Sequence, residues 1–414
     1  MELVRISTAG SVDDGKSTLI GRLLHDNNAL TKEQETLVLQ KTKEKGWDDL
    51  DLSVITDGLV AEREQGITID VAHIYFSTDT HKFIIADSPG HIEYTRNMVT
   101  GASTAETSII LVDARKGLLE QSFRHFFISN LLKLDSVIFC VNKMDLVDYN
   151  EDRFLEIAIE IKNMVSDLGE KIPFKILPVS SLKGDNVVVK SKKMKWYTGP
   201  TLNEILHDSN SKKSVKQPFR FDVQQVYHAQ NKDFVDFRGF AGRVISGTIS
   251  TGDRVRTFPS GNESVVTEIR RYTDVLNEAS ADDSVVLSLA DEIDISRGST
   301  ICLADSSATK EQKELSATVV WLDEKPALQG SKLIFKVGAR ESLSKIQSIN
   351  YTIDPASPKN HLTSSQIELN DISNVDLRLS KPVFMDSYSE NKKNGVFLLV
   401  DPQSNATVGV GFAD

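Results

Sequence analysis

The sequence predicts an α/β domain with a doubly wound, mostly parallel sheet, followed by two small β-barrel domains. In the first half of the chain, almost uninterrupted apolar runs alternate with helical patterns, as is typical of a parallel sheet that is buried on both faces. Beyond a polar stretch at 207–218 the helical pattern fades. Short alternating runs separated by turn signals then take over, which favours small barrels.

The elements of the first half follow from local patterns. Among the helical patterns, 151–168 is the clearest, because apolar residues recur there every three or four positions. Asn150 is a suitable N-cap for this helix, and Gly169 can end it. The strand candidates are the apolar runs at 3–8, 71–77, 83–86, 108–112, 136–141 and 175–179.

The second half contains β-type runs bounded by turn signals such as Ser246-Gly247. A second polar break at 304–314 precedes another β-rich stretch. We therefore predict an α/β domain at 1–212 and β-barrel domains at 213–306 and 307–414. The clearest runs of the first barrel are 240–245, 254–258, 265–270 and 285–289.

Composition limits the class of protein. The 414 residues are 40% hydrophobic and carry a net charge of −11. The hydrophobic content excludes a disordered chain. The sequence contains no uninterrupted run of about 18 apolar residues, so it predicts no membrane helix. The acidic balance argues against a general nucleic-acid binder. Two cysteines, Cys140 and Cys302, and an N-terminus without a signal-peptide pattern predict a cytoplasmic protein.

A phosphate-binding loop is predicted at 10–17, because GSVDDGKS fits G-x-x-x-x-G-K-[ST] between a strand candidate and a helical pattern. Glycines let backbone N–H groups surround phosphate oxygens, and the start of a helix adds positive potential. We expect Lys16 to reach the β- and γ-phosphates and the Ser17 hydroxyl to ligate Mg²⁺. The predicted nucleotide contacts are Gly10, Ser11, Val12, Asp13, Asp14, Gly15, Lys16, Ser17 and Thr18.

Three further polar segments each follow a strand candidate. Taken alone, the first two also fit an ordinary turn, and the third carries almost no information. In Asp87-Ser88-Pro89-Gly90, the carboxylate is expected to hold Mg²⁺ and the Gly90 N–H to contact a γ-phosphate. In Asn142-Lys143-Met144-Asp145, the Asp145 carboxylate can accept two hydrogen bonds from guanine, whereas adenine presents the opposite pattern. The third segment, Ser180-Ser181-Leu182, can supply N–H groups to the guanine carbonyl.

In the second of these segments, Asn142 is expected to bridge the base and the phosphate loop, and the Lys143 stem to lie along the ring. Together with the phosphate loop, the three segments predict a guanine-nucleotide switch that uses GTP and Mg²⁺.

The motifs resemble the translation-factor class of GTPases, typified by elongation factor Tu. The segment 65–69, QGITI, is similar to the first switch of that class, and 87–91, DSPGH, to its D-x-P-G-H. The resemblance implies that Thr68 ligates Mg²⁺ and that His91 orients the attacking water, with Val12 and Ile67 forming an apolar gate. The expected catalytic residues are Lys16, Thr68 and His91, and the expected metal ligands are Ser17, Thr68 and Asp87.

A narrower resemblance, to the large GTP-hydrolysing subunits of bacterial sulfate adenylyltransferases, runs nearly from end to end. Elongation factors of this class usually carry His where Ser11 stands and Arg where Gln65 stands, so both departures weigh against translation. The similar segments are 10–18 (GSVDDGKST), 57–70 (DGLVAEREQGITID), 94–103 (YTRNMVTGAS), 196–202 (WYTGPTL), 236–242 (DFRGFAG), 291–298 (DEIDISRG) and 404–409 (SNATVG).

This resemblance implies an enzyme subunit that couples GTP hydrolysis to the formation of adenosine 5′-phosphosulfate and pyrophosphate from ATP and sulfate. It implies a smaller partner subunit that carries the adenylyl-transfer site, and we expect neither a nucleic-acid nor a membrane partner. No residue pattern in this chain independently indicates binding of ATP or sulfate. The alternative is an elongation-factor-like GTPase that delivers aminoacyl-tRNA to the ribosome.

Overall fold

The computed structural model describes residues 2–46, 49–56, 72–88, 95–167, 172–208, 217–229, 237–305, 311–354 and 361–414. The chain divides into two compact units. The first comprises Met1–Lys213 and Asp354–Asn360, and the second comprises Ser214–Ile353 and His361–Asp414. Most of the linker predicted at 207–218 lies outside the described residues.

A six-stranded sheet with the order β2-β3-β1-β4-β5-β6 forms the centre of the first unit. Its neighbours are parallel except for β2, which pairs antiparallel to β3 at the edge. All six predicted strands are present, within two residues of the predicted bounds. They are β1 (Glu2–Ala9), β2 (Ala72–Ser77), β3 (His81–Asp87), β4 (Thr107–Asp113), β5 (Ser136–Asn142) and β6 (Phe174–Pro178).

The register of this sheet brings polar strand ends together. Thr8 pairs with Asp87, and Asp113 pairs with Asn142, so the carboxyl ends of four neighbouring strands lie at one edge. The strand order reverses around β1, and open α/β sheets bind ligands at the carboxyl ends beside such a reversal. The topology therefore gathers the predicted motifs in one place.

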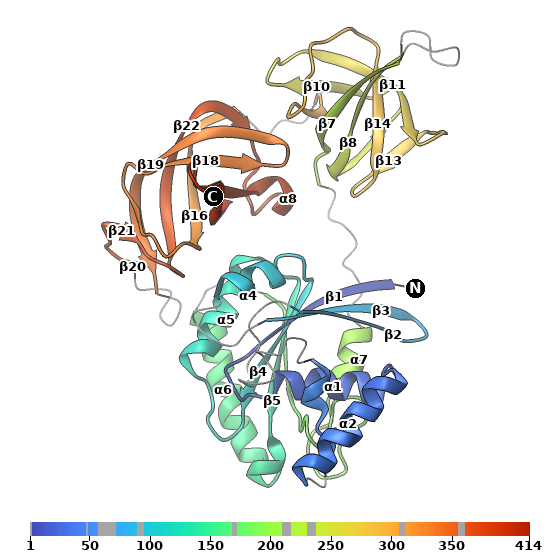
Figure 1. Ribbon diagram of the computed structural model, residues 1–414, viewed down its shortest axis with the longest axis vertical. Coiled ribbons are helices and arrows are strands. Elements are labelled where there is room, and N and C mark those ends of the chain that lie inside the picture. The colour runs from blue at the N-terminus through green and yellow to red at the C-terminus, as the bar shows by residue number, and fades with distance from the viewer. Residues whose placement is uncertain are drawn as a thin grey trace. The chain divides into compact units, whose positions relative to one another are not determined.

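Helices cover both faces of this sheet: α4, α5 and α6 lie on one side, and α1, α2 and α7 lie on the other (Figure 1). Leu19 and Leu23 from α1 and Leu206 from α7 pack in one core with Ile6 and Ile109 of the sheet. The helices are α1 (Lys16–Asp26), α2 (Lys32–Lys45), α4 (Thr95–Ala102), α5 (Glu120–Leu131), α6 (Glu151–Asp167) and α7 (Leu202–His207), with the 3-10 helices η1 (Leu52–Ile55) and η3 (Met144–Val147).

The helix predicted at 151–168 is confirmed as α6. The Asn150 side chain caps it by accepting a hydrogen bond from the Arg153 N–H at 2.9 Å. Its buried face includes Phe154, Ile157 and Ile161. Gly169, the predicted end, lies outside the described residues.

The second unit contains two closed barrels. In the first, six strands follow the order β10-β15-β7-β8-β14-β11, and a β10–β11 pairing closes the ring. Phe221, Val255 and Leu287 are among the side chains that fill its core. The strands of this part are β7 (Arg220–Ala229), β8 (Phe237–Ser246), β9 (Thr248–Ser250), β10 (Arg254–Phe258), β11 (Glu263–Arg271), β12 (Asp274–Leu276), β13 (Glu278–Ser280), β14 (Ser284–Leu289) and β15 (Thr300–Leu303).

The C-terminal barrel follows the order β18-β23-β24-β16-β22-β19 and is closed by a β18–β19 pairing. Phe335, Leu377 and Phe397 belong to its core. Its elements are β16 (Glu311–Trp321), β17 (Ala327–Leu328), β18 (Lys332–Val337), β19 (Arg340–Ile353), β20 (His361–Leu362), β21 (Gln366–Ile367), β22 (Ile372–Phe384), the short helix α8 (Lys392–Gly395), β23 (Val396–Val400) and β24 (Thr407–Ala413).

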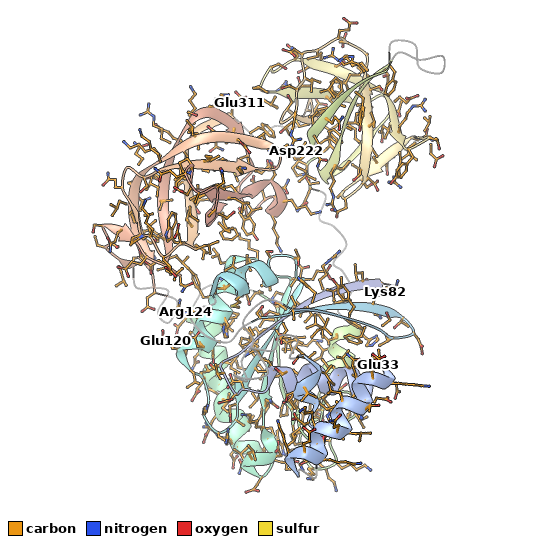
Figure 2. All side chains as sticks on the ribbon, in the orientation of Figure 1. Glu33, Lys82, Glu120, Arg124, Asp222 and Glu311 are labelled. Carbon is orange, nitrogen blue, oxygen red and sulfur yellow. The ribbon has the colours of Figure 1, made fainter. Side chains whose placement is uncertain are left out.

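Buried ion pairs join the two barrels within the second unit. Arg220 is fully buried at the start of β7, and its Nη2 lies 2.8 Å from Oδ1 of Asp386, just after β22. Two residues along β7, Asp222 (labelled in Figure 2) is ion-paired with Arg340, whose Nη2 lies 3.4 Å from Oδ1 of the aspartate. The domain boundaries at 212/213 and 306/307 stay predictions.

Two expectations from composition can be compared with the structure. Cys140 and Cys302 are both buried and unpaired. Within the ranges described, no helix has the length and hydropathy that crossing a membrane requires.

Candidate functional site

The predicted phosphate loop runs from the end of β1 to the start of α1. Asp13 and Gly15 adopt left-handed conformations, with φ of 66° and 93°. At Gly15 a Cβ atom would lie 2.6 Å from Nδ2 of Asn142, so a side chain there would displace a neighbouring motif. The glycine thus serves both the turn and the close approach of Asn142.

Lys16 begins α1, and its side chain lies along the loop. Its Nζ donates to the carbonyl oxygens of Gly10 at 2.7 Å and of Ser11 at 3.2 Å. Burial lowers the pKa of the ammonium, and the negative charge of Asp87 opposes this shift. A buried cation on a helix N-terminus gives the loop the positive potential that a polyphosphate requires.

Asp14 is a buried carboxylate inside the loop. Its Oδ2 accepts a hydrogen bond from the Ser11 N–H at 2.7 Å, and burial raises its pKa to about 6. Among the described residues, Oδ1 of Asp14 and the hydroxyls of Ser11 and Ser88 are buried without a hydrogen-bond partner. Buried polar groups are normally satisfied, so this cluster fits a polar ligand.

Asp87 ends β3, beside the loop. Its Oδ1 accepts a hydrogen bond from the Thr8 hydroxyl at 2.7 Å, which orients the carboxylate. A carboxylate and the hydroxyl of Ser17 are oxygen donors, the ligand type that Mg²⁺ prefers. The predicted roles of Thr68, Pro89, Gly90 and His91 fall on residues outside the described part of the chain.

Asn142 connects two predicted motifs directly. Its Nδ2 donates to the Asp14 carbonyl at 2.7 Å, and its Oδ1 accepts from both the N–H and the hydroxyl of Ser181 at 2.9 Å. Residues at sequence positions near 14, 142 and 181 therefore form one buried network.

Lys143 also reaches the phosphate loop. Its Nζ donates to the Asp13 carbonyl and, at 2.9 Å, to Oδ2 of Asp113. Arg115 donates to the same Asp113 carboxylate through Nε and Nη2. Although burial raises the pKa of Asp113, the hydrogen bonds from Arg115 and Lys143 hold it well below its ordinary value, so this carboxylate is charged.

Asp145 is held by the third segment of the site. The Ser180 hydroxyl donates to Oδ1 of Asp145 at 2.6 Å. Met144 is fully buried at the start of η3, between the two polar residues of its motif. The segment 180–182 is held in turn by Arg22 of α1, whose Nε donates to the Ser181 carbonyl at 3.1 Å and whose Nη2 donates to the Leu182 carbonyl.

Residues 1–237 match the family described as the elongation factor Tu GTP binding domain, and residues 314–414 match the GTP-eEF1A C-terminal domain-like family. A curated relative from Cronobacter sakazakii (strain ATCC BAA-894), "Sulfate adenylyltransferase subunit 1", is 46% identical over 416 residues, which cover 99% of this chain and 86% of the relative.

The chain belongs to the sulfate adenylyltransferase subunit 1 family. Both resemblances noted in the sequence are thereby confirmed, and the family supports the sulfate-activating expectation over the elongation-factor alternative. A solved structure, "Crystal Structure Analysis of sup35 complexed with GDP", is 21% identical with a TM-score of 0.44, and covers 100% of this chain and 93% of its own. A likeness of that size adds nothing to the family assignment.

Among the residues of the network that the sequence pattern did not single out are Asp113, Thr8 and Arg22. Asp113 had a readable signal, because it ends a buried strand as Asp87 does. Thr8 and Arg22 had none, since a threonine in a strand and an arginine in a helix are ordinary by pattern. Their partners, at positions 87 and 181–182, are distant in the sequence.

Proposed function

We propose that this chain is the GTP-hydrolysing subunit of a sulfate adenylyltransferase, which couples hydrolysis to the formation of adenosine 5′-phosphosulfate and pyrophosphate from ATP and sulfate. The observation that carries this proposal is the 46% identity to a sulfate adenylyltransferase subunit 1 over 99% of the chain. The network that joins the predicted phosphate loop to the predicted base-selecting segment supports it.

In this proposal the phosphate loop binds GTP through backbone N–H groups and Lys16. Asp145 selects guanine by accepting from N1–H and the exocyclic amine, at about 1.5–3 kcal/mol for each hydrogen bond to a charged group. The bond from Ser180 to Asp145 supports this assignment, because it holds the acceptor in place. Asn142 keeps the base and phosphate segments at a constant separation.

Ser17, Thr68 and Asp87 are proposed to hold Mg²⁺. The oxygen chemistry of this donor set fits the ion, and the unpartnered buried hydroxyl of Ser88 lies next to Asp87 in sequence. When bound, Mg²⁺ neutralises negative charge on the β- and γ-phosphates.

Hydrolysis needs a water molecule placed in line with the γ-phosphate more than it needs a strong base. We assign this placement to His91, with Val12 and Ile67 as the apolar gate beside it. Lys16 stabilises the charge that develops on the phosphates.

The word "subunit" in the relative's name supports a partner. We propose a smaller subunit that carries the site for ATP and sulfate, in a cytoplasmic complex without nucleic acid or membrane contacts. The test is co-expression of this chain with the candidate small subunit. Formation of adenosine 5′-phosphosulfate should rise with GTP and not with a non-hydrolysable GTP analogue. Equal rates with both nucleotides would contradict the coupling.

A further inference from the structure

We infer that Arg22 is a positioning residue for guanine recognition, and this inference rests on the proposed GTP function. Arg22 lies in the middle of α1, the helix that begins with Lys16 of the phosphate loop. Its side chain is only 11% exposed and lies 3.5 Å from Asp26 one turn later. One helix therefore carries the predicted phosphate-binding lysine at its start and, further along, a largely buried guanidinium that bonds to the predicted base-binding segment.

Arg22 fixes two consecutive peptide planes of that segment. Nε donates to the Ser181 carbonyl at 3.1 Å, and Nη2 donates to the Leu182 carbonyl. The guanidinium is rigid and planar, so two bonds from one fork define the orientation of both carbonyls. Gly184 lets the segment approach this closely, because a Cβ there would lie 3.3 Å from Cδ of Arg22.

The first plane orients a backbone donor. The peptide bond between Ser181 and Leu182 is trans. In a trans peptide the N–H points opposite to the carbonyl. Because Arg22 draws the Ser181 carbonyl toward α1, the Leu182 N–H points away from α1, where it is available to the carbonyl oxygen of guanine.

The second peptide plane is connected through hydrogen bonds to the carboxylate of Asp145. With the Leu182 carbonyl held by Arg22, the following N–H, that of Lys183, donates to the Ser180 hydroxyl at 3.2 Å. The same hydroxyl donates to Oδ1 of Asp145 at 2.6 Å. Arg22 thus acts on both guanine-specific contacts, through Leu182 directly and through Ser180 on Asp145.

The test compares GDP with IDP, whose base lacks the exocyclic amine from which Asp145 is proposed to accept a hydrogen bond. In the full-length wild type, the ratio of Kd for IDP to Kd for GDP should be about 10 or more, from one hydrogen bond to a charged group. Arg22→Met should lower this ratio to about 3, because Asp145, which accepts from the amine that IDP lacks, loses its orientation through Ser180. The Leu182 contact to the base carbonyl, which both bases carry, should weaken equally for GDP and IDP. A role in stability alone would weaken both nucleotides equally and leave the ratio unchanged.

Arg153→Gln is the matched control. Arg153 also joins a helix to a loop carbonyl, with Nε donating to the Ala114 oxygen at 2.8 Å, and has no contact with the 180–182 segment. It should keep the wild-type ratio. If Arg22→Met does not fold, Arg22→Lys provides the same test. A single ammonium cannot hold both carbonyls in one plane, so this variant should lower the ratio about twofold.

An unchanged ratio in the Arg22 variants that fold would overturn the inference. A wild type that shows no preference for GDP over IDP would instead overturn the proposed base selection by Asp145. The first failure is measured in the Arg22 variants and the second in the wild type, so the two can be distinguished.

Discussion

Replacing Asn142 by alanine is expected to uncouple the base-binding and phosphate-binding segments of the first unit. The side chain donates to the Asp14 carbonyl at 2.7 Å and accepts two bonds from Ser181 at 2.9 Å. Asn142, Asp14 and Ser181 are each at most 2% exposed. Truncation therefore leaves buried donors and acceptors without the partner that satisfies them.

The size of the effect follows from these three bonds. A neutral hydrogen bond contributes about 1 kcal/mol net, so losing all three bonds should destabilise the arrangement of the two segments by about 3 kcal/mol. This corresponds to a factor of roughly 100 in an equilibrium constant. Water that enters the vacated space restores part of the loss, so we expect GDP binding to weaken by about 10- to 100-fold.

Two measurements on the full-length chain test this expectation. GDP titration gives the Kd, and hydrogen exchange reports whether the Ser181 amide, which donates to Asn142, loses protection. Asn27→Ala is the control, since Asn27 donates to the Leu23 carbonyl at 2.8 Å within the same unit and forms no hydrogen bond with either segment in the described part of the chain. A Kd within twofold of wild type, with unchanged exchange at Ser181, would refute the reasoning.

Three further substitutions test other parts of the site. Asp145→Asn replaces an acceptor by a donor and should shift preference from guanine to xanthine nucleotides, measured as the ratio of Kd values for GDP and XDP. His91→Ala should leave GTP affinity nearly intact while slowing single-turnover hydrolysis by about 100-fold or more. Burial raises the pKa of Asp14 from 3.8 to about 6, so its folded form holds the proton more tightly, and the resulting stabilisation is full below pH 3.8 and lost as the pH rises through 6. Asp14→Asn should flatten this fall, as measured by thermal unfolding between pH 4 and pH 7.

Each of these has an outcome that would count against it. An unaltered preference for GDP would remove Asp145 from base selection. Hydrolysis at the wild-type rate would end the assignment of water placement to His91. A pH dependence of unfolding that is the same in the wild type and Asp14→Asn would show that Asp14 titrates normally.

Structural features that depend on residues close together in the sequence can be predicted from the sequence alone. The strands of the first unit are buried on both faces, so their apolar runs stand out, and α6 shows its buried face at helical spacing. The phosphate loop was readable for the same reason, because its glycines, lysine and serine act through one continuous stretch of backbone.

The helix α2 is an element that apolar periodicity does not predict. Its described buried residues are Val38 and Thr42, so the sequence has no apolar stripe to detect. A different signal was present: Thr31 and Gln34 form a capping box, in which each side chain bonds the backbone of the other residue. A surface helix of this type is better recognised from its cap than from its periodicity.

By itself, the sequence determined the types of elements, the phosphate loop and the residues with the right chemistry for guanine. These depend on side-chain type and on spacing along a few turns of chain. Only the tertiary structure decided that Asn142 bridges Asp14 and Ser181 and that Arg22 holds the Ser181 carbonyl. The physical reason is that hydrogen bonds act over about 3 Å. The sheet register and α1 bring together groups that lie 39 to 159 residues apart in the sequence.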